Sequence, residues 1–470
     1  MNEPIQSFSE IVGAEHVLTS PADKVRYEED WRYENGKAAF IVRPGNTEEV
    51  AAVVRVCGVR GLKIVPQGAV TGLVGASVPD QSGTQIVLSL ERLKVPLSID
   101  PVNRTATAGA GVLLSALNEA AGAHGLFFPI DLGADPTLGG MVAANTGGSR
   151  LIRYGDVRHN LLGLEVVDGQ GNIFNLLKDL RKDNTGLDLK QVFVGTGGAF
   201  GVVTAAVVAL APVPVQRATV LAVPRSLEEV NTILMAAERE FGSLLTSFEG
   251  MSRHAMDYAI RHVPNTPNPF GGEIPEYALL IELSSQSTEE GGDLEDRLVG
   301  FVMAHYDEQG GKPIIDAVTG RAEGLWALRH HLSEGLRHEG KVIGLDISVS
   351  RSQLWTFKSA AKVLLKKEFP FLKLCDFGHC GDGSDHFNLV WTAEAGPYDP
   401  EQARAVRQAV YELLVRSYGG SFSAEHGIGP ANQAYYHQYV PQEVQGVAGQ
   451  FKRIFDPRDV LGNIRLGCEG

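Results

Sequence analysis

The sequence predicts an α+β fold of two domains, and three observations indicate it. Short β-branched strands alternate with helical stretches over residues 39–215. Two prolines, Pro212 and Pro214, then follow an apolar segment and mark a boundary. Over residues 219–425, longer amphipathic helices separate the strands, which is the pattern of an antiparallel sheet with helices on one face.

The expected elements follow in chain order. In the first domain the strands are AFIVRP, LKIVP and TQIVLSL, and the helices run over Thr47–Arg60 and Leu113–Gly125. In the second domain the strands are ATVLAVP, YALLIELSS and FNLVW, and the helices run over Ser226–Phe241 and Gln402–Ser417. A last helix is expected over Gln442–Phe455, before Asp456 and Pro457. The domains are therefore placed at residues 1–215 and 216–425, with a segment at 426–470 that packs near their junction.

Length and composition narrow the class of protein. The chain of 470 residues has 44% hydrophobic and 21% charged residues, which is ordinary for a globular protein. A net charge of -14 disfavours nucleic acid and anionic membranes as partners. The four cysteines include no C-x-x-C pair, so we expect reduced thiols rather than a disulfide framework or a thiolate zinc site.

Neither a membrane span nor export is expected. The apolar run from Phe200 to Ala211 is well short of the ~20 residues that cross a bilayer. The first residues are acidic and lack both the apolar core of a signal peptide and the Arg-rich pattern of a transit peptide. A cytoplasmic protein is the resulting expectation.

Three glycine-rich segments hold much of a glycine surplus, since 54 glycines exceed the roughly 7% of average usage. They are PQGAVTGLVG at residues 66–75, PTLGGMVAANTGG at 136–148 and GTGGAFG at 195–201. Glycine lets main-chain N–H groups approach a phosphate closely, so three such loops together predict a bound diphosphate. Any one of them alone is explained equally well as a tight turn or a bulge.

Two common nucleotide-binding schemes are excluded. A Rossmann site requires G-x-G-x-x-G between a strand and a helix, but Phe200 stands where the segment that begins at Gly195 needs its third glycine. The P-loop signature is also absent from the sequence. Nucleotide binding is therefore expected to follow another scheme.

Longer strings make the chain recognisable. PQGAVTGLVGASVP, LGGMVAANTGG, LIRYGDVRHNLLGLEVV and LRKDNTGLDLKQVFVGTGGAFGVVT resemble the vanillyl-alcohol oxidase flavoprotein family, in its D-2-hydroxyglutarate and D-lactate dehydrogenase branch. Residues 39–215 resemble the family's FAD-binding domain of two subdomains, and residues 219–465 resemble its C-terminal oxidase domain. The resemblance implies an FAD-dependent D-2-hydroxy acid dehydrogenase.

The resemblance also implies which residues contact FAD, mostly through the main chain. These are Gln67, Gly68, Ala69, Val70, Thr71, Gly72, Ala76, Ser77, Pro136, Thr137, Gly140, Asn145, Gly201, Val202 and Val203. Some family members attach flavin covalently to a histidine in the first loop, whereas this loop offers Ala69 and Val70, so non-covalent FAD is expected. Three residues depart from the family's usual pattern: Ala69 and Val70 replace Gly and Asn, and Gly197 replaces a common glutamate.

Two glycine-flanked motifs carry a histidine and carboxylate constellation. GHCGDGSDHFN at residues 378–388 contains His379 and His386, and SAEHGIG at 423–429 contains Glu425 and His426. His379 and His386 are seven residues apart, so they would face opposite sides of a regular strand, and the glycines between them permit a bend that reunites them. Two imidazoles and one carboxylate suit a three-ligand metal site with open positions, although spacing alone leaves structural histidines as the alternative.

The resemblance assigns roles to these motifs. It implies a divalent metal held by His379, His386 and Glu425, with Zn²⁺ expected and Mn²⁺ or Co²⁺ as alternatives, and His426 as the general base. A histidine suits that task because its unperturbed pKa lies near 6.5. The alternative role of His426 is only to orient Glu425. The implied substrate-binding residues are Arg329, Ser333, Asn388 and His426.

One departure leaves the substrate open. The hydroxyglutarate enzymes of the branch carry a lysine shortly before an Asp-x-Ser segment, and in KVIGLDIS at residues 341–348 that place is Gly344. D-2-hydroxyglutarate stays the first expectation, with D-lactate or a bulkier D-2-hydroxy acid as alternatives. The electron acceptor is expected to be a protein or a quinone. The second hypothesis for the function is an oxidase that uses oxygen as its acceptor. The third is a flavin-binding module without catalytic activity. The sequence is compatible with a homodimer and does not determine the oligomeric state.

Overall fold

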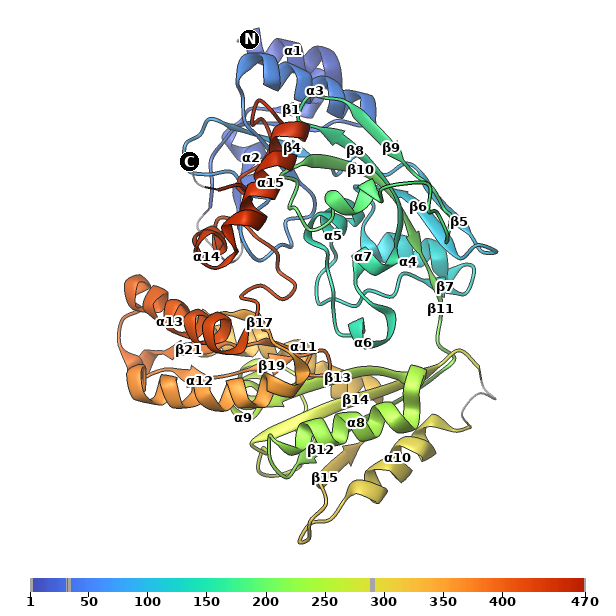
Figure 1. Ribbon diagram of the computed structural model, residues 1–470, viewed down its shortest axis with the longest axis vertical. Helices are drawn as coiled ribbons and strands as arrows, with labels where there is room; N and C mark the ends of the chain where they lie inside the picture. The colour runs from blue at the N-terminus through green and yellow to red at the C-terminus, as the bar shows by residue number, and fades with distance from the viewer. Residues whose placement is uncertain (1–2, 31, 33–34, 288–291, 469–470) are drawn as a thin grey trace. The chain divides into compact units, whose positions relative to one another are not determined.

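The computed structural model describes residues 3–30, 32, 35–287 and 292–468, and the chain divides into two compact units (Figure 1). The first unit consists of Met1–Gly147, Asp156–Val213 and Glu425–Gly470, and the second of Gly148–Gly155 and Pro214–Ala424. The chain passes into the second unit after Val213, close to the expected boundary. Residues 148–155, which contain the short helix α6 (Leu151–Tyr154), are grouped with the second unit.

The first sheet of unit 1 has the strand order β1-β2-β4-β3. Its strands are β1 (Val17–Leu18), β2 (Ala38–Val42), β4 (Gln85–Ser89) and β3 (Ile64–Gln67). Strands β2 and β3 both run parallel to β4, and α3 (Thr47–Arg60) connects β2 with β3. Helix α3 begins where the Asn46 side chain accepts a hydrogen bond from the N–H of Glu49, and it ends at Gly61, whose φ of 66° is left-handed.

The second sheet of unit 1 is antiparallel and has the order β5-β6-β10-β8-β9. Its strands are β5 (Leu97–Asp100), β6 (Thr105–Gly109), β10 (Gly201–Ala209), β8 (Leu161–Asp168) and β9 (Ile173–Leu176). The central strand β10 is buried over Gly201–Val208, and the side chains of α4 (Leu114–Gly122) and α5 (Leu138–Ala144) belong to the same core. This core positions the glycine-rich loops at its edges.

The C-terminal segment completes unit 1. It contains α14 (Gln433–Tyr439) and α15 (Gln442–Phe455), after which Leu461 forms a parallel bridge to Ile64 of β3. The Asp456 carboxylate is buried and accepts hydrogen bonds from the N–H groups of Val460 and Leu461, at 2.8 and 2.7 Å. The end of the chain is therefore part of the first unit's core.

Unit 2 is built on a seven-stranded sheet of order β15-β12-β14-β13-β19-β20-β17. Its strands are β15 (Ile314–Thr319), β12 (Gln216–Pro224), β14 (Tyr277–Ser285), β13 (Leu245–Ser252), β19 (Phe377–Gly378), β20 (Ser384–His386) and β17 (Asp346–Ser348). Neighbouring strands of this sheet are antiparallel, as expected. A smaller sheet joins β16 (Gly340–Ile343), β21 (Leu389–Thr392) and β18 (Lys373–Leu374).

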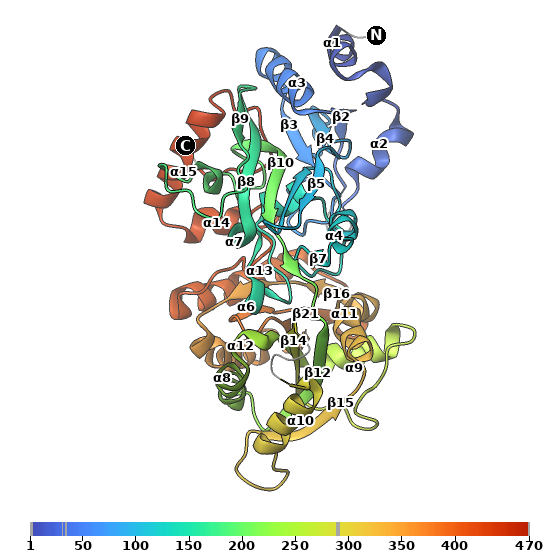
Figure 2. The same cartoon turned by 90° about the vertical axis from the view of Figure 1, so that its right-hand side faces the viewer.

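Helices cover both faces of the large sheet, so the expectation of helices on one face is wrong (Figure 2). Trp326 of α11 (Ala322–Glu339) donates a hydrogen bond to Glu282 on one face of β14, whereas Trp355 of α12 (Leu354–Glu368) packs against Tyr277 on the other. Helix α9 (Arg253–His262) shares a core with α11, and α8 (Glu229–Phe241) is hydrogen-bonded to Trp355 through Asn231. Every residue of β14 is buried, which is the pattern of a strand that is covered on both faces of its sheet.

Several expected elements are confirmed to the residue, namely Thr47–Arg60, Tyr277–Ser285 and Gln442–Phe455. The helix expected over Gln402–Ser417 starts earlier, as α13 (Pro400–Glu412), because the Asp399 side chain caps it and Pro400 occupies its first turn. Among the described residues no helix is long and apolar enough to cross a membrane. All four cysteines are free, and all but Cys468 are buried.

Candidate active site

The three glycine-rich segments converge in unit 1. A methyl group on Gly68, in the loop after β3, would lie 2.3 Å from Oγ1 of Thr137, the N-cap residue of α5. The N–H of Gly197 donates to the carbonyl of Ala143 at 2.8 Å. Segments that are distant in the sequence thus form one wall, and at Gly68 only a glycine permits the contact.

Gln67 fits a polar ligand at this wall. Its amide nitrogen donates to the carbonyls of Tyr27 and Ser77, at 2.9 and 2.7 Å. Its Oε1 is buried and has no hydrogen-bond partner among the described residues. Buried acceptors are almost always satisfied, so a hydrogen-bond donor on a bound dinucleotide would complete this group.

The first glycine-rich loop contains a residue in an uncommon backbone conformation. Val70 has a φ of 57°, in the left-handed region that β-branched residues avoid. Ala69 and Gly72 beside it are exposed, so their main-chain groups can reach a ligand. The loop contains no histidine, which fits non-covalent binding.

The polar side chains of the second segment already have partners within the protein. Thr137 Oγ1 accepts from the N–H of Gly140 at 3.3 Å, and Asn145, with a φ of 53°, ends α5. The Asn145 amide donates to Asp156 at 2.9 Å and accepts from the N–H of Arg158 at 2.8 Å. These side chains form hydrogen bonds within the segment, so the predicted FAD contacts at Thr137 and Asn145 would be made chiefly by main-chain atoms.

The third predicted contact, Gly201–Val203, is the start of β10. The side chains of Val202 and Val203 are buried in the hydrophobic core. The register of β10 with β8 begins at Gly201, whereas its register with β6 begins at Ala205. At residues 201–203 the main chain of β10 is therefore paired with β8. On its other side, the pairing of β10 with β6 begins only at Ala205.

The C-terminal motif reaches this wall as well. The N–H of Ala431 donates to the carbonyl of Val74 at 3.2 Å, and a methyl group on Gly429 would lie 2.4 Å from the same oxygen. The Asn432 side chain folds the segment by accepting from Gly429 N–H and donating to the Gly427 carbonyl, at 2.9 and 2.8 Å. His426 therefore begins a segment that is fixed against the first glycine-rich loop.

A second group of polar residues lies within unit 2, around Glu249 of β13. Glu249 is 1% exposed, and its Oε1 lies 2.8 Å from Nδ1 of His379. Its Oε2 accepts a hydrogen bond from Nε of Arg329 at 2.9 Å and lies 2.8 Å from Nη2 of the same guanidinium. Burial would raise the pKa of Glu249, but His379 and Arg329 outweigh it and lower the pKa to about 2. The guanidinium of Arg329 also lies over the ring of Phe377, 5.0 Å from its centre.

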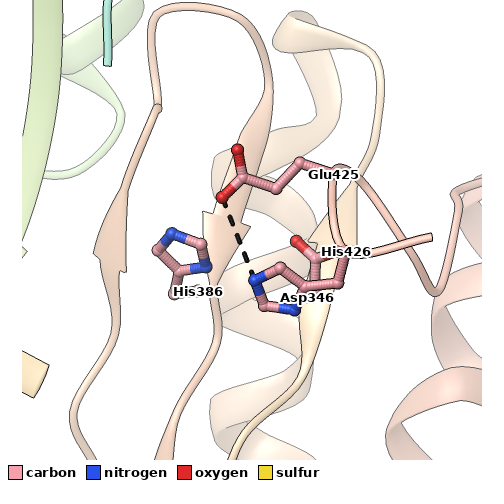
Figure 3. Close-up of side chains that lie close together, drawn as sticks. All are labelled: Asp346, His386, Glu425 and His426. Atoms are coloured by element: carbon pink, nitrogen blue, oxygen red, sulfur yellow. Dashed lines mark ion pairs between the residues drawn. The ribbon is translucent and has the colours of Figure 1, made fainter. Parts of the chain in front are cut away.

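Four potential metal ligands lie together: Asp346, His386, Glu425 and His426 (Figure 3). Each offers one ligand atom, and these atoms lie within 4.8 Å of one another. Asp346 and His386 are directly opposite each other in the pair β17–β20. The chain that leads to Glu425 is held by a bridge between Ser421 and Ser348 of β17. Imidazole and carboxylate donors suit Zn²⁺ or Mn²⁺, so this donor set fits the expected divalent metal.

The structure brings two of the three predicted metal ligands, His386 and Glu425, into this cluster. His379 is not part of it, although its ring centre lies 5.3 Å from that of His386. Nδ1 of His379 lies 2.8 Å from Oε1 of Glu249, so a metal would be bound through Nε2. His426 lies in the cluster, with Nε2 3.9 Å from Oε1 of Glu425. Its role as base and the role of His379 as ligand remain predictions.

Asp346 and Glu249 were missed by sequence reasoning. In the sequence, the Asp-x-Ser segment that contains Asp346 served only to locate the neighbouring Gly344. Asp346 is indicated as a metal ligand by its position opposite His386 in the strand pair β17–β20. Glu249 stands in the all-buried strand LTSFEGMS, where a carboxylate requires a partner. That requirement was the available signal.

Three of the four predicted substrate-binding residues, Arg329, Ser333 and Asn388, lie in unit 2, and His426 belongs to unit 1. Arg329 and Ser333 lie one helical turn apart on α11, and Ser333 is exposed. Asn388 is buried, and its Nδ2 donates to the carbonyl of His386 at 3.2 Å, so it supports the bend after β20. Lys341 is exposed on β16, opposite Trp391 of β21.

A buried ion network supports the histidine motif. Lys358 of α12 pairs with Asp376 and, at 3.1 Å, with Asp385, which directly precedes His386. Burial would lower the pKa of Lys358, but the two carboxylates outweigh it and raise the pKa. Burial is also the main cause that raises the pKa of Asp385, to about 7.

Two family models match the chain: an FAD binding domain over residues 38–177, and the C-terminal domain of FAD linked oxidases over residues 213–465. The chain is 30% identical to a mitochondrial D-2-hydroxyglutarate dehydrogenase of Arabidopsis thaliana, over 99% of this chain and 81% of the relative. It is 31% identical to a D-2-hydroxyglutarate dehydrogenase of Xanthomonas citri pv. viticola, over 99% and 97% of the two chains.

The fold is similar to that of a solved enzyme structure. A structure of p-cresol methylhydroxylase with bound substrate superposes with a TM-score of 0.72 at 18% identity, over 100% of this chain and 97% of that one. At this identity the likeness shows the fold alone, and it agrees with the α+β architecture expected from the sequence.

We expect Gly68→Ala to weaken flavin binding without unfolding the protein. The added methyl group would displace Thr137, and with it the start of α5. The measurement is the flavin absorbance per mole of purified protein, together with the melting temperature. Gly122→Ala in α4 is the control, because nothing lies within 4 Å of its added methyl group. Equal flavin content in both variants would contradict the assignment of this wall.

We expect Lys358→Met to lower the free energy of unfolding by roughly 3–5 kcal/mol, since it leaves two buried carboxylates without their cation. Lys362→Met, one turn further along α12 and exposed, should change it by less than about 0.5 kcal/mol. Denaturant unfolding of both variants tests this. A similar loss in the two would mean that the buried network does not stabilise the unit.

Proposed function

The chain belongs to the FAD-linked oxidase family, and from that premise we propose that it oxidises a D-2-hydroxy acid to the 2-oxo acid. It is an FAD-dependent oxidoreductase. D-2-hydroxyglutarate is the first candidate substrate, because the curated relatives are named for that activity. The observation that carries the proposal is the cluster of two imidazoles and two carboxylates, since oxidation of an alcohol needs a proton acceptor and is helped by a cation.

The cofactors are FAD and a divalent metal. When bound, FAD supplies the acceptor of the C2 hydride at its N5, and the metal, Zn²⁺ first and Mn²⁺ or Co²⁺ as alternatives, supplies a Lewis acid that lowers the pKa of the hydroxyl group. Gln67 and the glycine-rich wall would hold FAD without a covalent bond. His379, His386 and Glu425 would hold the metal, with Asp346 as a further oxygen donor.

His426 would accept the proton of the substrate hydroxyl. Its segment is fixed against the first glycine-rich loop by the hydrogen bond from Ala431 to Val74, and its ring lies 3.9 Å from Glu425. A general base must be positioned near the hydroxyl and must be unprotonated when the hydride leaves. A neutral imidazole of His426 would meet both conditions.

Arg329 would bind the substrate carboxylate. Glu249 occupies its Nε and Nη2, and Phe377 lies under its plane, so the N–H groups at Nη1 point in a fixed direction. Ser333 and Asn388 are the further proposed contacts. Gly344 supplies no charge for a distal carboxylate, so D-lactate or a bulkier D-2-hydroxy acid remains the alternative substrate.

We expect His426→Ala to slow flavin reduction by about 10²–10⁴-fold, the usual contribution of a general base, while the protein stays yellow. The measurement is anaerobic stopped-flow bleaching of the flavin by a saturating D-2-hydroxy acid. His124→Ala, at an exposed position of unit 1, is the matched control. An unchanged reduction rate in His426→Ala would exclude this residue as the base.

A substrate panel tests the activity itself. We expect anaerobic bleaching of metal-replete protein by D-2-hydroxyglutarate, D-lactate or a larger D-2-hydroxy acid, and not by the L isomers. Gly344→Lys should lower the KM for D-2-hydroxyglutarate and leave that for D-lactate unchanged, because it adds a cation where the relatives' branch carries one. If no member of the panel bleaches the flavin, the non-catalytic binding module replaces the proposal.

The acceptor is proposed to be a protein or a quinone rather than oxygen. Stopped-flow mixing of the reduced flavin with air-saturated buffer distinguishes the two. Slow reoxidation is expected, and rapid reoxidation would make the protein an oxidase.

A further inference from the structure

We propose that Glu249 is a positioning residue that fixes the tautomer of His379, and that Arg329 determines which end of residue 249 faces the imidazole. The inference rests on the proposed metal site. It gives Glu249 a role in that site. It also links Arg329, which is predicted to bind the substrate carboxylate, to the predicted metal ligand His379.

The contact geometry leaves little freedom to the carboxylate. Oε1 of Glu249 lies 2.8 Å from Nδ1 of His379, and Oε2 lies 2.9 and 2.8 Å from two nitrogens of Arg329. The side chains of Glu249, Arg329 and His379 are 1%, 11% and 10% exposed, so water does not compete freely for these bonds. Both oxygens are thus committed, each to a different partner.

A carboxylate can only accept, and this selects one tautomer of His379. The hydrogen must be on Nδ1, so the lone pair is on Nε2, the nitrogen that a metal requires. Carboxylate–histidine–metal arrangements of this kind orient the ring and raise its basicity. Glu249 would therefore prepare His379 as a ligand before any metal is bound.

Arg329 differs from His379 in one decisive respect. A guanidinium can only donate, whereas a neutral imidazole can donate or accept at Nδ1. If residue 249 were a glutamine, its single oxygen would turn to Arg329 and its NH₂ group would face His379. His379 would then accept at Nδ1 and carry its hydrogen on Nε2, where it blocks metal binding.

The experiment measures the Zn²⁺ affinity of the metal-free, FAD-loaded full chain by competition with a chromophoric chelator. We expect Glu249→Gln to weaken Zn²⁺ binding by roughly 10–100-fold, the usual effect of losing such a partner. In the double variant Glu249→Gln/Arg329→Met, no donor competes for the amide oxygen, which can turn to His379. We expect its Zn²⁺ affinity to return to within about threefold of the wild type, because the Nδ1–H tautomer is again favoured.

Glu282→Gln is the matched control. Glu282 is equally buried, at 1%, on the adjacent strand β14, and it accepts from Trp326 of α11 at 2.7 Å. Its substitution should change Zn²⁺ affinity by less than about twofold, since neither Glu282 nor Trp326 belongs to the proposed metal site. Flavin absorbance and the melting temperature show that each variant is folded, and the double variant, which buries no charge at the two positions, also tests the idea if Glu249→Gln does not fold.

The outcomes separate this inference from the proposed function. If Glu249→Gln binds Zn²⁺ like the wild type, or if the double variant stays as weak as the single one, the tautomer role is overturned while the dehydrogenase proposal stands. Wild-type protein without Zn²⁺ affinity would overturn both the metal site and this inference. Wild-type protein that binds Zn²⁺ but is reduced by no D-2-hydroxy acid would overturn the proposed function, and the affinities would still decide the role of Glu249.

Discussion

Burial of charge inside the sheet of unit 2 is the constraint on which its site depends. An ion removed from water costs several kcal/mol unless a partner of opposite charge is held beside it. Glu249 has its partners in His379 and Arg329, and Lys358 has Asp376 and Asp385. One predicted metal ligand is bonded to the first of these groups, and another, His386, directly follows the second. The same buried ion pairs therefore contact His379 directly and hold the residue that precedes His386.

In the first unit, the proposed FAD site would require main chain to lie close to a dinucleotide. Gly68 packs on Thr137, and Gly429 packs on Val74, at separations that leave no room for a side chain. Side chains such as Thr137 and Asn145 are used internally to shape the loops. Binding through such a wall would depend on backbone geometry, so it would tolerate Ala69 and Val70 in place of the more usual residues.

The strands and helices with clear periodicity, such as Thr47–Arg60 and Tyr277–Ser285, could be predicted from the sequence because their pattern is local. Helices on both faces of the sheet could not, since strand burial on two sides depends on elements far along the chain. His386, Glu425 and His426 were recognisable from short motifs. Asp346 and Glu249 were not, because their importance comes from strand pairing and from a partner 130 residues away in the sequence.

The interrupted course of the first unit has a consequence for biosynthesis. Residues 214–424 of the second unit are made between the strands of the first unit and its closing segment. Phe455 and Leu461 belong to the first unit's core, and Leu461 pairs with Ile64. On the ribosome, the first unit must wait with part of its hydrophobic interior uncovered until the final residues emerge, whereas most of the second unit can fold earlier. Chaperone protection during translation would accordingly be needed for the N-terminal part of the chain.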